Sequence, residues 1–286
     1  MKNKSINIEI SSENSFVIGE DWASDDHKSC YVENVKLGRD ICKNSKVAVL
    51  SLARNCEKNL QKSIDQIKKL QSSELKIFIY ENDSVDLTKE ILSENKSPQI
   101  SISLNTDQQP FLKDRSRRRT NNLADYRNKC LEWARQECSN FDYALVLDLD
   151  ADAGFSIDGI YNSISWLQKI EKSAGMGSHS LCYNNNEFTH YDTFAIRIKS
   201  FIGSSKHMNN GERGFINYHP HVGSKPFSLY SCFGGLAVYK MQCFLKGNYD
   251  GSTGCEHILF HKSLRDYGYE MYLNPSSIFF TVLNQD

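Results

Sequence analysis

The chain has 286 residues, of which 40% are hydrophobic and 24% are charged, the composition of an ordinary globular protein. Its formal net charge of -1 excludes a global attraction to nucleic acid or to an anionic membrane. Because no apolar run is long enough to span a bilayer and the first residues lack a signal-peptide core, we expect a soluble, cytoplasmic protein.

Residues 1–44 are polar and contain weak strand-like pieces at 15–18 and 30–35, so we expect an extension that packs on the following domain. The pattern then changes, and residues 46–52 and 75–80 read as buried strands on either side of a helix with apolar positions between 60 and 70. This βαβ unit predicts parallel pairing. A turn in which Asp83 or Ser84 can cap a helix, a third strand at 100–104 and a helix at 121–137 follow.

The second half of the chain is less regular. Asn-rich loops with aromatic residues follow residue 152, and a helix is expected to open at Glu256, ahead of a strand-like segment at 269–273. Gly234 and Gly235 indicate either a close approach of a ligand to the backbone or a bulge in a strand. We expect one domain over 45–286, with a first half at 45–152 and a loop-rich second half at 153–286.

Nine cysteines are scattered along the chain, and none is spaced as Cys-x-x-Cys. An odd number without metal-ligand spacing predicts buried free thiols rather than a zinc cage or a disulfide framework.

Three aspartates at alternate positions, Asp148, Asp150 and Asp152, directly follow an apolar strand pattern that starts at Tyr143. In an α/β sheet, ligands bind at the carboxyl ends of the strands. If the chain stays extended, the three carboxylates share one side, and so much negative charge favours a divalent cation. The pattern therefore predicts a metal site and a bound phosphate; the role of Asp152 stays open.

Other side chains suit the same chemistry. Arg127, on the helix before this strand, is expected to approach a nucleotide or its diphosphate, and the basic run at 113–119 either closes over an anion or is simply solvated. Glu256 and His257 at a helix start can act as general base or metal ligand. His261 lies one turn beyond His257, so the two imidazoles could bind a metal or be structural.

Taken together, these residues resemble a GT-A glycosyltransferase, and more narrowly the Cap59-type fungal capsule mannosyltransferases. The resemblance extends over about residues 45–275 and rests on an ordered set of short motifs: Glu81-Asn-Asp-Ser84 with Asp86 and Thr88, Arg119 with Leu123-Ala124 and Arg127-Asn128, Asp148-Leu-Asp150, Tyr191-Asp192 ahead of Arg197, Ser231-Cys-Phe-Gly-Gly235, and Cys255-Glu-His257.

The resemblance implies an α/β GT-A fold, Rossmann-like, with a central, mostly parallel sheet flanked by helices and a loop-rich acceptor half. It also implies transfer of a hexose, possibly mannose, from a GDP- or UDP-hexose to a glycan or glycolipid hydroxyl, in surface polysaccharide synthesis. The implied nucleotide-sugar site contains Ala53, Arg54, Asn55, Glu81, Asp83, Arg127 and Asp148. Asp148, Asp150 and His261 are the candidate ligands of Mn²⁺ or Mg²⁺, and Glu256 or His257 would face the acceptor.

Two other functions remain open at this point. A sugar-phosphate nucleotidylyltransferase also places carboxylates and metal on such a sheet, but it should carry a glycine-rich phosphate loop after the first strand, where this chain has Ala53-Arg-Asn55. A non-catalytic carbohydrate-binding module would use the aromatic loops and bind Ca²⁺ at the acidic cluster. No nucleic-acid partner is expected, while peripheral membrane contact is possible for an enzyme that acts on a glycolipid.

Overall fold

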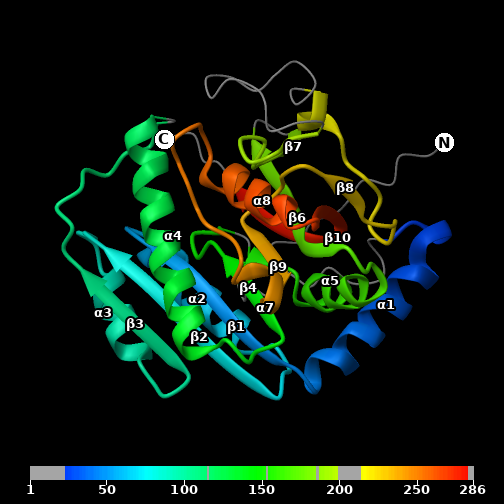
Figure 1. The fold of residues 1–286 in the computed structure, drawn as a ribbon, viewed down its shortest axis with the longest axis horizontal. Helices are drawn as coiled ribbons and strands as arrows, with labels where there is room; N and C mark the ends of the chain where they lie inside the picture. The colour runs from blue at the N-terminus through cyan, green and yellow to red at the C-terminus, as the bar shows by residue number, and fades with distance from the viewer. Residues whose placement is uncertain (1–22, 115, 153, 185–186, 199–213, 283–286) are drawn as a thin grey trace.

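The computed structural model describes residues 23–114, 116–152, 154–184, 187–198 and 214–282 (Figure 1). Within these ranges a ten-stranded sheet has the order β3-β2-β1-β4-β9-β6-β10-β5, with β7 beside β6 and β8 beside β10. Because this sheet includes strands from both halves of the sequence, it joins the two halves in one layer. The mixed α/β architecture, mostly parallel and flanked by helices, is the predicted GT-A type.

The first half contains the predicted βαβ unit, in which β1 and β2 pair in parallel. β1 also pairs in parallel with β4, and β2 with β3. The elements are β1 (Lys46–Ala53), α2 (Glu57–Ile67), β2 (Glu74–Asn82), α3 (Thr88–Asn95), β3 (Ile100–Asn105), α4 (Arg117–Glu137) and β4 (Tyr143–Leu147).

The second half contains more strands than its loop-like sequence predicted. β9 is antiparallel to both β4 and β6, and β6 is parallel to β10, so β9 is the junction of the halves. The elements are β5 (Gly154–Phe155), α5 (Ile157–Lys169), β6 (Ser173–Asn184), β7 (Glu187–His190), the 3-10 helix η2 (Gly214–Asn217), β8 (Phe227–Leu229), β9 (Leu236–Lys240), α7 (Met241–Phe244), α8 (Glu256–Asp266) and β10 (Glu270–Val282).

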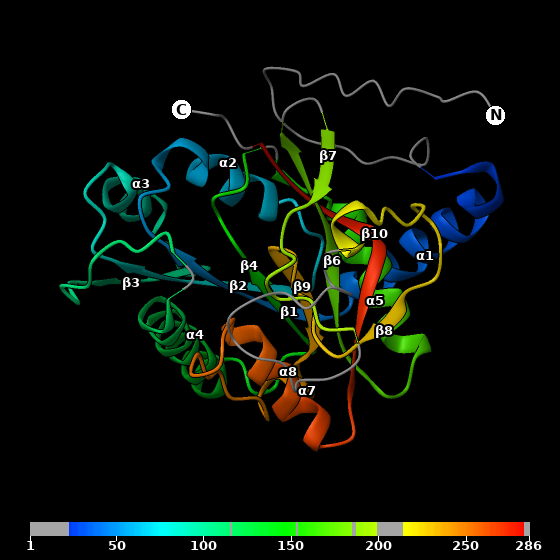
Figure 2. The same ribbon diagram turned by 90° about the horizontal axis from the view of Figure 1, so that it is seen from above.

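Helices cover both faces of the sheet, as Figure 2 shows from above. On one face, α2 and α5 bury Leu60 and Ile164 in a core with strand residues such as Leu145. On the other face, α4 and α8 bury Leu131 and Phe260 in a second core. Each core therefore takes side chains from both halves of the chain.

The strand-like reading of residues 30–35 is wrong. These residues belong to α1 (Asp25–Lys43), which buries Tyr31, Asn34, Val35, Gly38 and Cys42 at helical spacing. The helix packs closely on α5, because a Cβ on Gly38 would lie 1.7 Å from the Tyr161 carbonyl oxygen. The other strand-like piece, at residues 15–18, lies outside the described residues.

All nine cysteines are free, and eight of them are buried, as predicted. Burial raises the pKa of buried thiols among them, that of Cys42 to about 12 for example. In the described part of the chain no helix combines the length and the apolar character that a membrane span requires.

Candidate active site

A cavity of about 650 Å³ opens at the carboxyl ends of β1, β2 and β4, the edge at which α/β sheets bind ligands. Its walls come from both halves of the chain. The first half contributes Leu52 to Arg54, Cys56, Asn82, Pro110 to Asp114, Arg119, Asn122, Leu123, Tyr126, Arg127 and Asp148 to Asp150, and the second half contributes Tyr191, Asp192, Phe194, Phe233 and Cys255 to His257.

The three aspartates after β4 do not share one side. The strand ends at Leu147, and Leu149 turns into the core, while Asp148 and Asp150 line the cavity. Asp152 instead accepts hydrogen bonds from Asn59 Nδ2 (3.0 Å) and Thr281 Oγ1 (3.1 Å). The expectation of three aligned carboxylates fails because the chain leaves the extended conformation, and Asp152 anchors the loop to α2 and β10.

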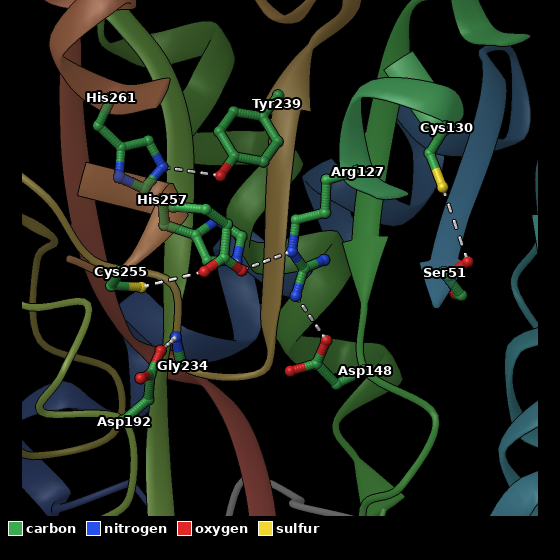
Figure 3. Close-up of polar contacts among 11 residues, drawn as sticks. Ser51, Arg127, Cys130, Asp148, Asp192, Gly234, Tyr239, Cys255, His257 and His261 are labelled. Carbon is green, nitrogen blue, oxygen red and sulfur yellow. Dashed lines mark hydrogen bonds and ion pairs between the residues drawn. The ribbon is translucent and has the colours of Figure 1, made fainter. Parts of the chain in front are cut away.

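Arg127 connects the carboxylates of the two halves (Figure 3). Its Nη2 donates to Asp148 Oδ1 at 3.0 Å and its Nε donates to Glu256 Oε1 at 2.8 Å. Burial alone would lower the pKa of Arg127, but the two carboxylates raise it well above its ordinary value. The guanidinium therefore stays charged and fixes α4 against β4 and α8.

The acidic pair has raised pKa values. Although much of Asp150 is open to the cavity, desolvation by the surrounding protein atoms raises its pKa to about 6, and the neighbouring Asp148 adds to the shift. Desolvation also raises the pKa of Asp148, against the opposing effect of Arg127. Two carboxylates that resist ionisation side by side are a site where a cation would be stabilised.

Glu256 and His257 lie where α8 begins, and both line the cavity. His257 stacks on Phe233 with ring centroids 3.8 Å apart, and among the described residues neither of its ring nitrogens has a hydrogen-bond partner. Burial lowers the pKa of His257 well below its ordinary value, so the imidazole is neutral.

His261 is not brought to the carboxylates. Its Nδ1 shares a hydrogen bond with Ser231 Oγ (2.8 Å), and its Nε2 shares one with Tyr239 Oη (2.9 Å). The residue is absent from the cavity wall, and both ring nitrogens are engaged in the core. His261 is therefore a structural histidine, and we do not retain it as a metal ligand.

The turns after β1 and β2 hold each other. Asn55 and Asp83 both adopt positive φ (51° and 55°), a conformation that Asn and Asp tolerate better than most residues. The Asn55 backbone N–H donates to Ser84 Oγ, and Asn55 Oδ1 accepts from the Val85 backbone N–H. Neither Asp83 nor Ser84 caps α3, whose N-cap is Leu87 without a side-chain hydrogen bond.

The residues expected around the nucleotide consequently divide into two groups. Ala53 and Arg54 line the cavity, and the Arg54 guanidinium lies 5.3 Å from the Phe111 ring centroid. Asn55, Glu81 and Asp83 lie outside the cavity wall and shape it from behind. Glu81 is fully buried and accepts from the Ser84 backbone N–H (2.8 Å), while Asp83 accepts from the Gln108 and Gln109 backbone N–H groups.

The basic run is only partly a loop. Ser116 caps α4 by accepting from the Arg119 backbone N–H, so Arg117, Arg118 and Arg119 form the first helical turn rather than preceding the helix. Lys113 and Arg119 reach the cavity wall. The helix N-terminus and these cations together favour an anion in the cavity.

Asp192 and Phe233 are cavity residues that the sequence did not single out for a role. The only signal was their presence in the short motifs Tyr191-Asp192 and Ser231 to Gly235, which are about 40 positions apart. The Gly234 backbone N–H donates to Asp192 Oδ2 at 3.0 Å (Figure 3). Burial raises the pKa of Asp192 to about 7.

Gly234 and Gly235 form neither of the two features considered for them. They precede β9 with φ of 74° and 77°. A Cβ on Gly234 would lie 2.3 Å from the Ser178 carbonyl oxygen, and one on Gly235 would lie 2.6 Å from the Phe279 ring. The close approach is therefore to strands of the protein itself.

The donor set suits a hard divalent cation. Mg²⁺ is commonly held by one or two carboxylates together with substrate phosphates and water, and Asp148 and Asp150 supply such a pair. Across the described residues, no group of three His, Cys, Asp or Glu side chains is placed to hold a metal by itself. A metal at this site would therefore depend on oxygens of a bound ligand.

The fold and this cavity define a GT-A type glycosyltransferase. The sequence model of Glycosyl transferase family 2 matches residues 49–244, most of the chain. The chain belongs to this family. The match favours glycosyl transfer over the nucleotidylyltransferase and carbohydrate-binding alternatives, but it does not reach the narrower Cap59-type resemblance.

Solved structures with the same fold include three that were determined with nucleotide ligands. GalNAc-T7 with UDP, GalNAc and Mn²⁺ is 14% identical over 85% of this chain and 45% of its own, with a TM-score of 0.58. The mannosyltransferase PcManGT from Pyrobaculum calidifontis with GDP-Man and Mn²⁺ is 14% identical over 91% and 66%, with a TM-score of 0.52. S. aureus TarS residues 1–349 with UDP-GlcNAc is 11% identical over 84% and 59%, with a TM-score of 0.51.

This chain therefore spans between 45% and 66% of the length of those three proteins. No curated protein sequence matches it.

Proposed function

We propose that the protein transfers a hexose from a nucleoside diphosphate sugar to a hydroxyl group of a glycan or glycolipid, with Mn²⁺ or Mg²⁺ as cofactor. The observation that carries this proposal is the cavity itself, which is lined by Asp148 and Asp150 of the first half and by Glu256 and Asp192 of the second. The ligands in the similar structures, UDP or GDP-Man with Mn²⁺, support the same donor class.

The donor would extend across the cavity. Ala53, Arg54 and Asn82, at the ends of β1 and β2, would contact the nucleoside, while Lys113, Arg119 and the start of α4 would attract the diphosphate. Asp148 and Asp150 would hold the metal, which when bound neutralises charge on the leaving diphosphate. Arg127 orients Asp148 from behind and opposes the rise in its pKa.

Glu256 is the better placed general base. Its Oε1 is held by Arg127, and its Oε2 lies 3.7 Å from Cys255 Sγ, so its orientation is fixed at the cavity wall. The low pKa of the buried His257 makes that imidazole a weak base. If the transfer inverts the anomeric centre, Glu256 takes the proton of the acceptor hydroxyl; if it retains, Glu256 and His257 position the acceptor.

The narrower assignments extend this proposal. The Ser231 to Gly235 and Cys255 to His257 motifs resemble those of the Cap59-type mannosyltransferases, so mannose is the first donor sugar to test. Surface polysaccharide synthesis is the corresponding process. The division into a nucleotide-sugar half at 45–152 and an acceptor half at 153–286, with residues 1–44 as an extension, belongs to the same proposal.

Thermal unfolding in the presence of UDP, GDP or CMP, with and without Mn²⁺, tests the proposal. A ligand at 100 times its Kd stabilises the folded state by about 2.7 kcal/mol, so one nucleoside diphosphate should raise the Tm by several degrees, and only with metal. Asp150→Asn should remove this metal-dependent rise. The matched control is Asp125→Asn, which changes an exposed carboxylate on α4 outside the cavity.

The same assay separates the alternatives. A carbohydrate-binding module would be stabilised by glycans and by no nucleotide, and a nucleotidylyltransferase would release pyrophosphate from a nucleoside triphosphate and a sugar phosphate. Either result, or an Asp150→Asn variant that transfers sugar as the wild type does, would contradict the proposal.

A further inference from the structure

Asp192 is the cavity carboxyl for which the reaction as described above has no use. It lies in the turn between β7 and the strand-like bridge at Arg197, on the second-half wall. In Figure 3, Asp192 lies with Gly234 on one side of the view, and Asp148 lies with Arg127 on the other side. Of the other polar groups on this wall, Glu256 is assigned above to the acceptor hydroxyl and His257 is stacked on Phe233.

Three parts of the chain fix the position of Asp192. Its carboxylate accepts from the Gly234 backbone N–H at 3.0 Å, and the Ala195 backbone N–H adds a second contact. Its own backbone N–H donates to Ser180 Oγ at 3.1 Å, and Ser180 Oγ is held in turn by His190 Nδ1 at 3.0 Å. The carboxyl is thus preorganised from behind by β6, β7 and the turn before β9.

The conformation of Gly234 is a necessary part of this support. With φ of 74° and no room for a Cβ beside Ser178, the backbone of residue 234 is held so that its N–H points at Asp192. The Ser231 to Gly235 motif and the Tyr191-Asp192 motif therefore act as one unit, although they are distant in sequence.

The location of Asp192 relative to the metal-binding pair determines what it can contact. A donor whose nucleoside lies at Arg54 and whose diphosphate lies at Asp148 and Asp150 directs its sugar toward the opposite wall. Resting on the proposed function, we propose that Asp192 is a specificity residue that hydrogen-bonds a hydroxyl group of the donor hexose.

The chemistry of the group agrees with this role. Because burial raises the pKa of Asp192 to about 7, the carboxyl is partly protonated at neutral pH and can both accept from and donate to a hydroxyl. A site built to bind a substrate hydroxyl discriminates strongly against ligands that lack it, since its own polar group is then left unpaired.

The test compares nucleotide sugars with the corresponding diphosphates. Calorimetry with Mn²⁺ measures the Kd of UDP and GDP and of a panel of UDP- and GDP-hexoses that includes GDP-mannose and UDP-GlcNAc. Wild-type protein should bind one nucleotide sugar more tightly than its diphosphate. Asp192→Ala should weaken that nucleotide sugar at least 10-fold while the Kd of the diphosphate changes less than 2-fold.

Two further variants separate recognition from structural damage. Asp192→Asn keeps an oxygen for the Gly234 N–H, so it should fold as the wild type does and bind the diphosphate normally, yet lose affinity for the sugar. Asp158→Asn, which removes a carboxylate from the surface ion pair with Arg39, should change neither Kd.

The outcomes distinguish the two proposals. Absence of any nucleoside diphosphate binding by the wild type would overturn the proposed function itself. Normal diphosphate binding would leave the function standing, and the role of Asp192 would then be overturned if no nucleotide sugar bound more tightly than its diphosphate, or if Asp192→Ala and Asp192→Asn weakened both ligands equally.

Discussion

Arg127 shows how one side chain can organise the carboxylates of a cavity that it also lines. It was expected to hold the nucleotide sugar, yet its Nε and Nη2 both donate to protein carboxylates. Removing one partner of a buried ion pair leaves an uncompensated charge, which is more costly than never having the pair. Arg127 therefore holds Asp148 and Glu256 in place from within the protein.

A buried histidine makes the stability of the folded protein depend on pH. Burial lowers the pKa of His261 to about 3 from an ordinary value of 6.5. Below pH 6.5 the unfolded chain binds a proton that the folded chain does not, so this residue contributes less stability as the pH falls. Between pH 7 and pH 5 the loss is roughly 2 kcal/mol by this linkage.

Replacing His261 should remove that dependence. His261→Gln should be less stable than the wild type at pH 7, because the contacts with Ser231 and Tyr239 are disturbed. The difference in free energy of unfolding between the two proteins, here called the gap, should be smaller by roughly 2 kcal/mol at pH 5. Urea unfolding at the two pH values measures both gaps. Comparison with a variant is needed because the raised pKa of Asp192 acts in the opposite direction.

His221→Gln makes the same substitution at an exposed position and serves as the matched control. A difference in unfolding free energy for His261→Gln that is the same at pH 7 and pH 5 would contradict the lowered pKa of His261.

At the scale of elements, local patterns predicted some segments well and others poorly. β1, β2 and β4 were recognisable because short apolar runs are bounded by polar turns. β6 and β10 were missed or truncated because they carry buried serines such as Ser178, Ser180 and Ser277, whose burial depends on strand partners distant in sequence. α1 was misread because its buried positions are buried by packing on α5, a helix that is distant in the sequence.

The site shows the same limit. Asp148, Asp150 and Glu256 follow recognisable element ends, so their types and positions indicated chemistry. The position of Asp192 is fixed by a hydrogen bond from Gly234, 42 residues away in the sequence. His261 was assigned to metal because helical spacing cannot reveal its contacts with Ser231 and Tyr239. Pairings across the sheet decide such cases, and a single sequence does not contain them explicitly.

The turn before β9 carries a prediction at this scale. Gly234→Ala places a methyl group 2.3 Å from the Ser178 carbonyl oxygen in a backbone conformation with φ of 74°. Gly268→Ala has the same kind of conformation, with φ of 84°, but no atom within 4 Å of the added Cβ. The second variant therefore isolates the conformational cost, about 1 to 2 kcal/mol, from the clash.

Urea unfolding should show Gly268→Ala destabilised by about 1 to 2 kcal/mol and Gly234→Ala by about 1 to 3 kcal/mol more, since forced overpacking adds to the conformational cost. Equal losses for both variants would mean that β6 moves aside at no cost, in conflict with a rigid support for Asp192.

For the whole molecule, the single sheet predicts that the two halves unfold together. β9 of the second half is hydrogen-bonded to β4 of the first, and both hydrophobic cores contain residues from each half. Neither half can lose its strands without exposing apolar surface of the other. We therefore expect one cooperative transition, even though sequence patterns divide the chain into two unlike parts.

Two tryptophans report on the two halves separately. Trp133 on α4 stacks on Phe78 with ring centroids 4.9 Å apart, and Trp166 lies on α5. Variants that retain only one of them, with Trp22 replaced by Phe in both, allow fluorescence to follow one half at a time.

In each variant the fluorescence and far-UV circular dichroism curves in urea should have the same midpoint, because each tryptophan belongs to the same cooperative unit. A fluorescence midpoint of the Trp133 variant displaced from its circular dichroism midpoint would show instead that the first half unfolds independently. The sheet would then join two domains rather than define one.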